Sequence, residues 1–241
     1  MSQQRFERRR RAARWRRLRP YVLSFLAAAL VGTGIWLVWF SKVLLVEHVD
    51  VQGATTMKTS DIRAQADVPL GVPLARLDAQ AIETRVARLE RVDTVGVSRA
   101  WPHTVRVRIV ERHPIAWVRA DGLIRQVDRY GVDFRTLDRE PDNLIEIRIF
   151  TMEPRTRQQA MESMARVVDF LRAGGQDVFR EVRFVSASSQ DSIHLELSGR
   201  RTVVWGSAER DAKKLTVLRA LLRIHASRYD VSAPELPTTK K

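Results

Sequence analysis

An unbroken run of 20 uncharged residues, from Tyr21 to Phe40, constrains the fold of this 241-residue chain more than any other feature. At 1.5 Å per residue, a helix of that length spans about 30 Å, the thickness of the hydrocarbon core of a bilayer. Tyr21 begins the run, and Trp36 and Trp39 lie near its other end, where aromatic rings favour the headgroup region. A helix buried in a globular core rarely runs so long without a polar face. We therefore expect a transmembrane helix over residues 21–40.

Positive charge is concentrated just before this run. Nine arginines lie between Arg5 and Arg19, where the only acidic residue is Glu7. By the positive-inside rule, residues 1–20 are expected to form a cytoplasmic basic tail and the chain after Lys42 to lie outside. A cleaved signal peptide fits less well, because its apolar region is shorter and a small-residue cleavage site follows it. The formal net charge of +14 thus reflects topology, and we expect no nucleic-acid partner.

The sequence contains little that indicates catalysis. It has no cysteine, which excludes disulfides, thiolate zinc sites and cysteine nucleophiles. Its five histidines are far apart, and motifs of serine hydrolases and of phosphate-binding loops do not occur. Asp128, Asp133 and Asp138 recur every five residues, which does not match a calcium loop, and a turn explains Asp128. We expect no enzymatic activity, no catalytic residue, no cofactor and no metal site.

The region after the apolar run reads as a small α+β unit. Alternating apolar residues predict three strands, at residues 45–51, 92–99 and 105–109. Two helices are expected between the first and second strands, capped by Ser60 and Asp78. Trp101 stands in the hairpin turn next to Pro102, where an aromatic residue usually packs against its own domain. The order strand, helix, helix, strand, strand predicts a compact sheet with two helices on one face.

A second unit follows, built mostly of short strands. Glu111 to Pro114 reads as a strand end at which the next unit begins, because proline cannot donate to a ladder. Strands are expected at residues 116–119, 123–127, 132–136, 144–149, 178–185, 193–197, 201–205 and 229–232. Helices are expected at residues 157–173 and 208–226. Residues 234–241 are polar and broken by proline, so we expect a disordered tail.

Several patterns along the chain occur together. They are the arginine-rich tail with its apolar run, VxxVxVxGA at Val46–Ala54, LxxLDxxAIxxRVxxLxxV at Leu74–Val92, RxWPxTxxxxxxER at Arg99–Arg112 and VxWGSxxxxxxKxxxLxxLL at Val203–Leu222. Together they resemble the bacterial cell-division protein family FtsQ, also called DivIB. The resemblance extends over nearly the whole chain, and its most specific part is Arg99–Arg112.

This resemblance implies an α+β fold in which a single transmembrane helix precedes a POTRA domain at residues 44–112. A mainly antiparallel β domain with flanking helices would follow at residues 113–233. The family resemblance further implies a non-enzymatic scaffold of the divisome, required for septum formation. It would be a single-pass protein of the cytoplasmic membrane, with its N-terminus inside and its folded domains outside, at the division septum.

The resemblance also implies partners. In the family, the POTRA domain serves localisation with other divisome proteins, and the last strand and preceding helix bind FtsB- and FtsL-like proteins. The matching positions here are the helix at residues 208–226 and the partner-binding candidates Tyr229, Asp230, Val231, Ser232 and Ala233. From the residues themselves we expect this strand to be a sheet edge that receives a partner strand. Tyr229 and Val231 would share one face and Asp230 and Ser232 the other, and Pro234 would keep the strand short.

Two other classes of function remain open on the sequence. One is a POTRA-containing secretion or assembly factor, which the single span without a barrel disfavours. The other is a membrane-anchored extracytoplasmic enzyme whose dispersed residues would meet only in the fold. A pocket that brings carboxylate, histidine or serine side chains within hydrogen-bond reach would favour the enzyme.

Overall fold

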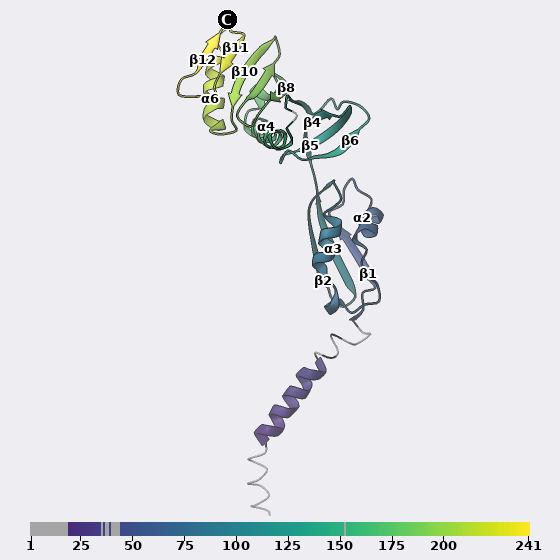
Figure 1. Cartoon of the computed structure of the whole chain (residues 1–241). Helices are drawn as coiled ribbons and strands as arrows, with labels where there is room; N and C mark the ends of the chain where they lie inside the picture. The colour runs from purple at the N-terminus through teal and green to yellow at the C-terminus, as the bar shows by residue number, and fades with distance from the viewer. Residues whose placement is uncertain (1–18, 35, 37–38, 40–43, 152) are drawn as a thin grey trace, which may run out of the picture. The chain divides into compact units, whose positions relative to one another are not determined.

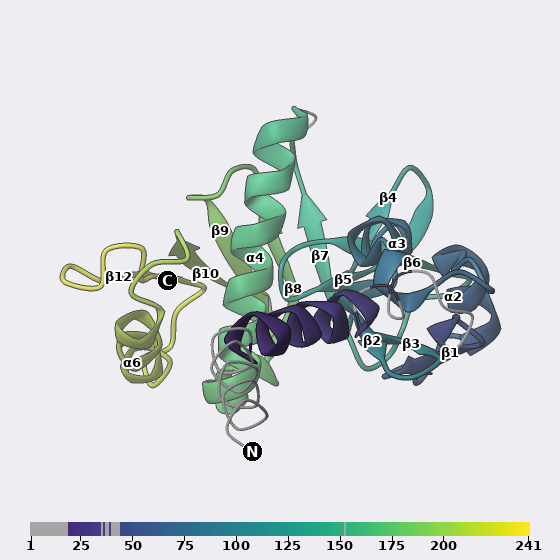
Figure 2. The same ribbon diagram turned by 90° about the horizontal axis from the view of Figure 1, so that it is seen from below.

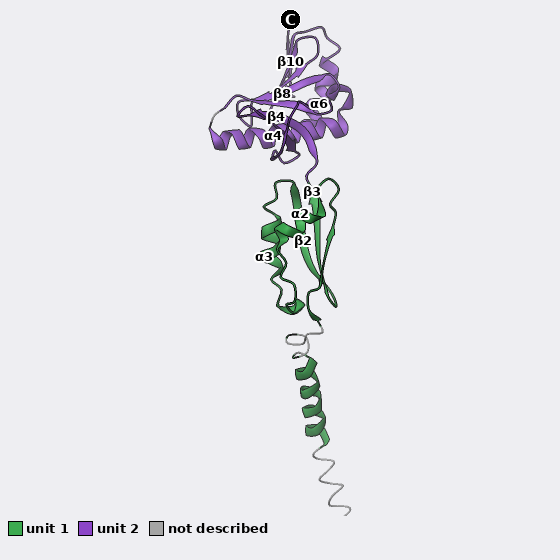
Figure 3. Ribbon diagram, turned by 90° about the vertical axis from the view of Figure 1, so that its right-hand side faces the viewer, with its two compact units in different colours: residues 1–111 green, residues 112–241 purple. Residues whose placement is uncertain are grey.

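The structure is a computed structural model that describes residues 19–34, 36, 39, 44–151 and 153–241 (Figure 1). The chain divides into two compact units, residues 1–111 and residues 112–241 (Figure 3). Residues 19–34 are helical, as are residues 36 and 39. Across the described residues, no helix is both long enough and apolar enough to cross a membrane. Part of the predicted span over residues 21–40, and most of the basic tail, lie outside the described residues.

Unit 1 contains a three-stranded sheet in the order β1-β3-β2. Its strands are β1 (His48–Gln52), β2 (Val92–Ala100) and β3 (Thr104–Glu111). The central strand β3 pairs parallel with β1 and antiparallel with β2. Helices α2 (Thr59–Ala66) and α3 (Ala79–Val86) and a short 3-10 helix (Leu74–Arg76) lie between β1 and β2 in sequence. The predicted order of elements is confirmed.

The alternation of buried and exposed residues along β3 explains how this unit forms its core. Val105, Val107 and Ile109 are buried against the helices, whereas the intervening residues are polar or exposed. Asp78 caps α3 as predicted, because its Oδ1 accepts the Ala81 N–H at 3.0 Å. The predicted cap at Ser60 is wrong. Helix α2 begins at Thr59 with its cap at Lys58, two residues earlier than expected, so Ser60 lies inside its first turn and its hydroxyl donates to Asp61 instead.

Unit 2 is one nine-stranded sheet in the order β12-β11-β10-β9-β8-β7-β4-β5-β6. Its strands are β4 (Pro114–Ala120), β5 (Leu123–Asp128), β6 (Asp133–Leu137), β7 (Ile145–Ile149), β8 (Val182–Ala187), β9 (Ile193–Leu197), β10 (Arg201–Gly206), β11 (Arg228–Asp230) and β12 (Thr238–Lys240). Five neighbouring pairs are antiparallel. Three are parallel, namely β4 with β7, β7 with β8 and β10 with β11. The sheet is therefore mixed but mainly antiparallel, as expected.

Helix α4 (Pro154–Gly174) connects the parallel strands β7 and β8 and lies across the middle of the sheet (Figure 2). Its buried face includes Met161, Met164, Val168 and Leu171, as the helical spacing predicted. The helix begins three residues earlier than expected. Pro154 occupies its first position and the Glu153 carboxylate accepts the N–H groups of the next residues, which makes an effective start signal.

Two boundaries in unit 2 differ from the prediction. The apolar run at residues 178–185 is not one strand, because residues Gln176–Phe179 form the short helix α5 and bury Val178 in the core. Helix α6 (Asp211–Leu221) is shorter than residues 208–226. It starts after Arg210, whose left-handed φ of 54° redirects the chain, and it ends before Ile224, which is 50% exposed rather than buried.

Candidate functional site

The outermost strand at one end of the unit 2 sheet is β12, in the part of the chain that we expected to be disordered. Thr238–Lys240 pairs antiparallel with β11, and Ser227 N–H donates to the Lys240 carbonyl at 2.9 Å. Strand β11 is thus enclosed between β10 and β12. The predictions of a disordered tail and of an edge at residues 229–233 are both wrong.

Contacts with α6 explain why this segment folds back. Glu235 Oε1 accepts from Arg210 Nη1 and from Lys213 Nζ, both at 2.8 Å. These bonds hold the connection between β11 and β12 beside the start of α6. Two β-branched threonines, Thr238 and Thr239, then follow Pro237 and suit an extended strand. Those threonines are the sequence signal that could have revealed β12, but a three-residue strand is too short for a periodicity argument.

The predicted partner-binding residues lie beside the edge rather than on it. Tyr229 and Val231 are buried in the core of unit 2, and the Tyr229 hydroxyl donates to the Ile224 carbonyl at 2.9 Å. Asp230 and Ser232 point the other way, and the Asp230 carboxylate accepts from the Ser232 N–H and hydroxyl. Ala233 is exposed. The predicted division between two faces is confirmed, and its buried pair anchors β11 in its own domain.

Backbone alternation shows which groups β12 offers to a partner. Val231 N–H donates to the Val204 carbonyl, and the Ser227 carbonyl accepts from Thr202 N–H. The backbone groups of Arg228 and Asp230, between these positions, therefore face β12. Their register partners Lys240 and Thr238 face back toward β11. Thr239 consequently directs its N–H and C=O outward, away from the sheet.

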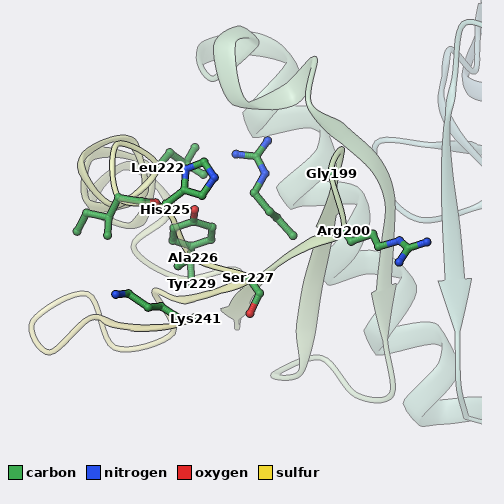
Figure 4. Close-up of a pocket in the computed structure, with 10 residues that line it drawn as sticks. Gly199, Arg200, Leu222, His225, Ala226, Ser227, Tyr229 and Lys241 are labelled. Carbon is green, nitrogen blue, oxygen red and sulfur yellow. Dashed lines mark hydrogen bonds between the residues drawn. The ribbon is translucent and has the colours of Figure 1, made fainter.

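A pocket of about 660 Å³ lies at the same end of the sheet, where the end of α6, the β9–β10 turn and the β11–β12 pair meet (Figure 4). It is lined by Gly199, Arg200, Arg201, Leu222, Ile224, His225, Ala226, Ser227, Tyr229 and Lys241. Figure 4 shows Leu222, His225 and Tyr229 grouped on one side, with the Arg200 guanidinium directed away from them. The pocket combines an apolar side with a cationic rim.

The charges around this pocket favour an acidic ligand. Among the described residues that line it, the charged ones are Arg200, Arg201 and Lys241. Arg201 also forms an ion pair with Glu181 at 2.5 Å and donates from Nε to the Ser198 carbonyl, so its guanidinium is fixed in place. An apolar side chain flanked by a carboxylate would suit this surface. In the described part of the chain, no group of three His, Asp or Glu side chains could hold a metal ion.

The Trp-Gly-Ser pattern at residues 205–207 has a structural explanation next to this site. Trp205 Nε1 donates to Asp211 at 2.8 Å, and Lys214 Nζ donates to the Ser207 carbonyl at 2.7 Å. Burial lowers the pKa of Lys214. Gly206 has a φ of 77°, and a Cβ there would lie 2.8 Å from the Ser232 Cβ. This pattern therefore positions α6 and the chain after β11, rather than supplying chemistry.

Comparison with known proteins assigns the family. The family described as "POTRA domain, FtsQ-type" matches residues 44–112. The protein named "Cell division protein FtsQ" of Streptomyces bingchenggensis is 38% identical over 241 residues, covering 95% of this chain and 88% of its own. This chain belongs to the FtsQ family. FtsQ proteins of Streptomyces coelicolor and Mycobacteroides abscessus are each 35% identical, covering 92% and 91% of this chain and 88% and 68% of their own.

Membership of the FtsQ family identifies this chain as a cell division protein with a POTRA domain. The matched residues 44–112 include the whole three-stranded sheet of unit 1, which ends at Glu111. The three-stranded sheet of unit 1 and its helices are therefore the POTRA domain. The family inferred from the sequence patterns is confirmed.

Proposed function

We propose that this FtsQ-family chain is a non-enzymatic, membrane-anchored scaffold of the divisome. Unit 2 would bind FtsB- and FtsL-like proteins by β-strand addition at β12, and the POTRA domain would bind other divisome proteins at the septum. The observation that carries the proposal is the open backbone edge at Thr239 beside the apolar, cationic pocket. A secretion factor or an extracytoplasmic enzyme is not favoured by the family.

The proposed anchor is the apolar run at residues 21–40, with the N-terminus inside and the folded units outside. In support, Tyr21, Phe25 and Leu30 are exposed on the helix at residues 19–34, where lipid would cover them. Thr33 donates its hydroxyl to the Ala29 carbonyl at 2.8 Å, which satisfies a polar group within the helix. A reporter active only outside the cytoplasm should work when fused after Lys241 and fail before Ser2. The opposite result would overturn this topology.

Because β12 is short, its backbone edge can supply only part of the affinity for a partner. A partner strand beside β12 could bond to both the N–H and the C=O of Thr239, and each bond contributes about 0.5–1.5 kcal/mol net. Pro237 has no N–H to add. The backbone alone would give weak binding, so most of the affinity must come from side chains of the partner in the adjacent pocket. A partner segment with an acidic residue near an apolar one would meet both requirements.

The decisive experiment uses two substitutions at one position. Thr239→Pro removes the outward N–H without removing a bond between β12 and β11, whereas Thr239→Ala changes the side chain and keeps the N–H. We expect the proline variant to lose capture of the FtsB- or FtsL-like partner and the alanine variant to retain it. Septal localisation, which depends on unit 1, should be unchanged in both.

Circular dichroism of both purified variants would show whether unit 2 remains folded. A folded Thr239→Pro variant that captures the partner at wild-type affinity would contradict strand addition at β12. Substitution of Val231 by proline is a poor test, because Val231 is buried and its N–H bonds within the sheet to Val204.

A further inference from the structure

One end of unit 1 exposes large apolar side chains, contrary to the sequence-based expectation for Trp101. Trp101, in the turn between β2 and β3, is 52% exposed, and Leu70, in the loop before the 3-10 helix, is 63% exposed. Each has an exposed proline next to it, Pro102 and Pro69. Apolar side chains exposed together on one surface mark a site of contact with a protein or a membrane.

Both residues belong to segments that flank residues 45–48, through which the chain enters the sheet. The His103 carbonyl accepts from the N–H groups of Glu47 and His48, at 2.9 and 3.1 Å. On the other side, Gly71 N–H donates to the Val46 carbonyl at 2.9 Å. The hairpin turn and the loop before the 3-10 helix therefore lie on either side of residues 45–48.

Arg99 connects two segments at this end of the domain. From the end of β2, its Nε donates to the Leu74 carbonyl at 2.8 Å and its Nη2 to the Leu77 carbonyl at 2.7 Å. These bonds tie the strand that leads into Trp101 to the segment that follows Leu70. The two exposed side chains are thus held at the same end of the domain.

The sequence places this end close to the apolar run. Only four residues lie between Phe40 and Leu45, and the five steps from one to the other reach about 18 Å at most when the chain is fully extended. If residues 21–40 cross the membrane, the end of unit 1 that holds Trp101 and Leu70 lies within that reach of the outer headgroups. Tryptophan favours the headgroup region, because its ring is apolar and its N–H is polar.

We propose that this end of the POTRA domain docks on the outer surface of the membrane, with Trp101 and Leu70 among the lipid headgroups. The inference rests on the proposed transmembrane anchor. Docking would fix the orientation of unit 1 on the bilayer, which a tether of a few residues alone would leave free. The surface that recruits other division proteins would then face a constant direction.

The absence of cysteine from the natural chain makes the test direct. Single cysteines replace Trp101 or Leu70 in the full chain, and Val110 provides the matched control. Val110 is also apolar and is 47% exposed, but it lies near the other end of β3, about 20 Å away. Each variant carries a small environment-sensitive fluorophore. Each is reconstituted as one copy per nanodisc of phosphatidylethanolamine and phosphatidylglycerol, which excludes contacts between copies.

Labels at positions 101 and 70 should be quenched by spin-labelled lipid and protected from aqueous iodide, and the label at position 110 should behave in the opposite way. Replacing Trp101 by serine in the Leu70→Cys chain should restore iodide quenching at position 70. This second variant separates docking from mere closeness to the bilayer, since the tether is unchanged.

Iodide quenching at positions 101 and 70 equal to that at position 110 would overturn the inference. The anchor is checked on the same variants reconstituted in vesicles of the same lipids, by extraction with alkaline carbonate. A chain that stays in the vesicles while position 101 remains accessible would refute docking alone. A chain that carbonate releases would refute the anchor, and the docking with it.

Discussion

Glu83 of α3 accepts the backbone N–H of Val97 on β2 through its Oε1, at 2.7 Å. Strand β2 is an outer strand of the unit 1 sheet, and it is the longest strand of that sheet. A strand added to this edge would need the Val97 N–H that the Glu83 carboxylate occupies. The carboxylate therefore protects the edge of the POTRA sheet, while the β12 edge of unit 2 has Thr239 open.

Removing this protection should promote self-association through β2. Glu83→Ala frees the Val97 N–H, whereas Glu83→Gln retains an oxygen that can accept it. We expect the alanine variant to sediment as larger species than the wild type at high concentration, and the glutamine variant to match the wild type. Analytical ultracentrifugation of the chain in detergent measures the difference. Equal sedimentation of all three proteins would show that Glu83 does not guard the edge.

Glu111 gives unit 1 a stability that depends on pH. Burial alone would raise the pKa of this carboxyl, but the Thr56 hydroxyl and the N–H groups of Met57, Thr56 and Thr55 donate to it and lower the pKa to about 2. Its usual value is 4.5. Because the folded pKa is the lower one, the stabilisation is present above pH 4.5 and is lost as the pH falls toward 2.

The matched variant is Glu111→Gln, which keeps one acceptor oxygen and removes the charge. We expect the wild type to be more stable at pH 7 by about 1–3 kcal/mol, the range for a charged hydrogen bond in a buried site. Urea unfolding at pH 7 and pH 3 should show the gap narrowing at the lower pH. A gap of constant size would mean that the Glu111 charge does not stabilise the fold.

Alanine variants of Gly131 and Gly122 distinguish the conformational cost of a side chain in a turn from the cost of a steric clash. Both have positive φ, 77° and 79°, so alanine at either site carries a conformational cost of about 1–2 kcal/mol. A Cβ at Gly131 would also lie 2.7 Å from the Glu162 nitrogen of α4, whereas open space surrounds Gly122. We therefore expect Gly131→Ala to lower the thermal midpoint of unfolding more than Gly122→Ala. Equal shifts would show that α4 yields to the added methyl group.

Periodicity predicted the elements in which apolar residues recur at the regular spacing of a strand or a helix. The alternation in β3 and the apolar face of α4 are visible in the sequence because Val107 or Met164 must be buried wherever the element lies. Contacts between distant residues gave no such signal. The bonds that the Glu111 carboxylate accepts from the loop at Thr55–Met57 join residues more than 50 positions apart, so Glu111 appeared only as the end of a strand.

The edge strand of the candidate site was predicted wrongly for the same reason. Residues 234–241 have the composition of a disordered tail, and their order depends on Arg210 and Lys213, which lie more than 20 positions earlier. The exposure of Trp101 was likewise outside the reach of a local argument. The hydrophobicity of a turn residue does not reveal whether its own domain has room to cover it.

The contact between Glu235 and α6 leads to a final prediction about how β12 is held. Glu235 is exposed, and its bonds from Lys213 and Arg210 lower its pKa. Exposed ion pairs contribute little to global stability, so Glu235→Ala should leave the unfolding transition of unit 2 unchanged. It should nevertheless weaken partner capture, because the connection that leads into Thr238–Lys240 loses its fixed position.

Asp177→Ala provides the control, since it breaks an exposed ion pair with Arg219 of the same helix but leaves Glu235 in place. High salt should reduce the difference in capture between Glu235→Ala and the wild type, as it screens the wild-type contact. If both variants capture the FtsB- or FtsL-like partner equally well at low salt, the ion pairs of Glu235 do not position β12.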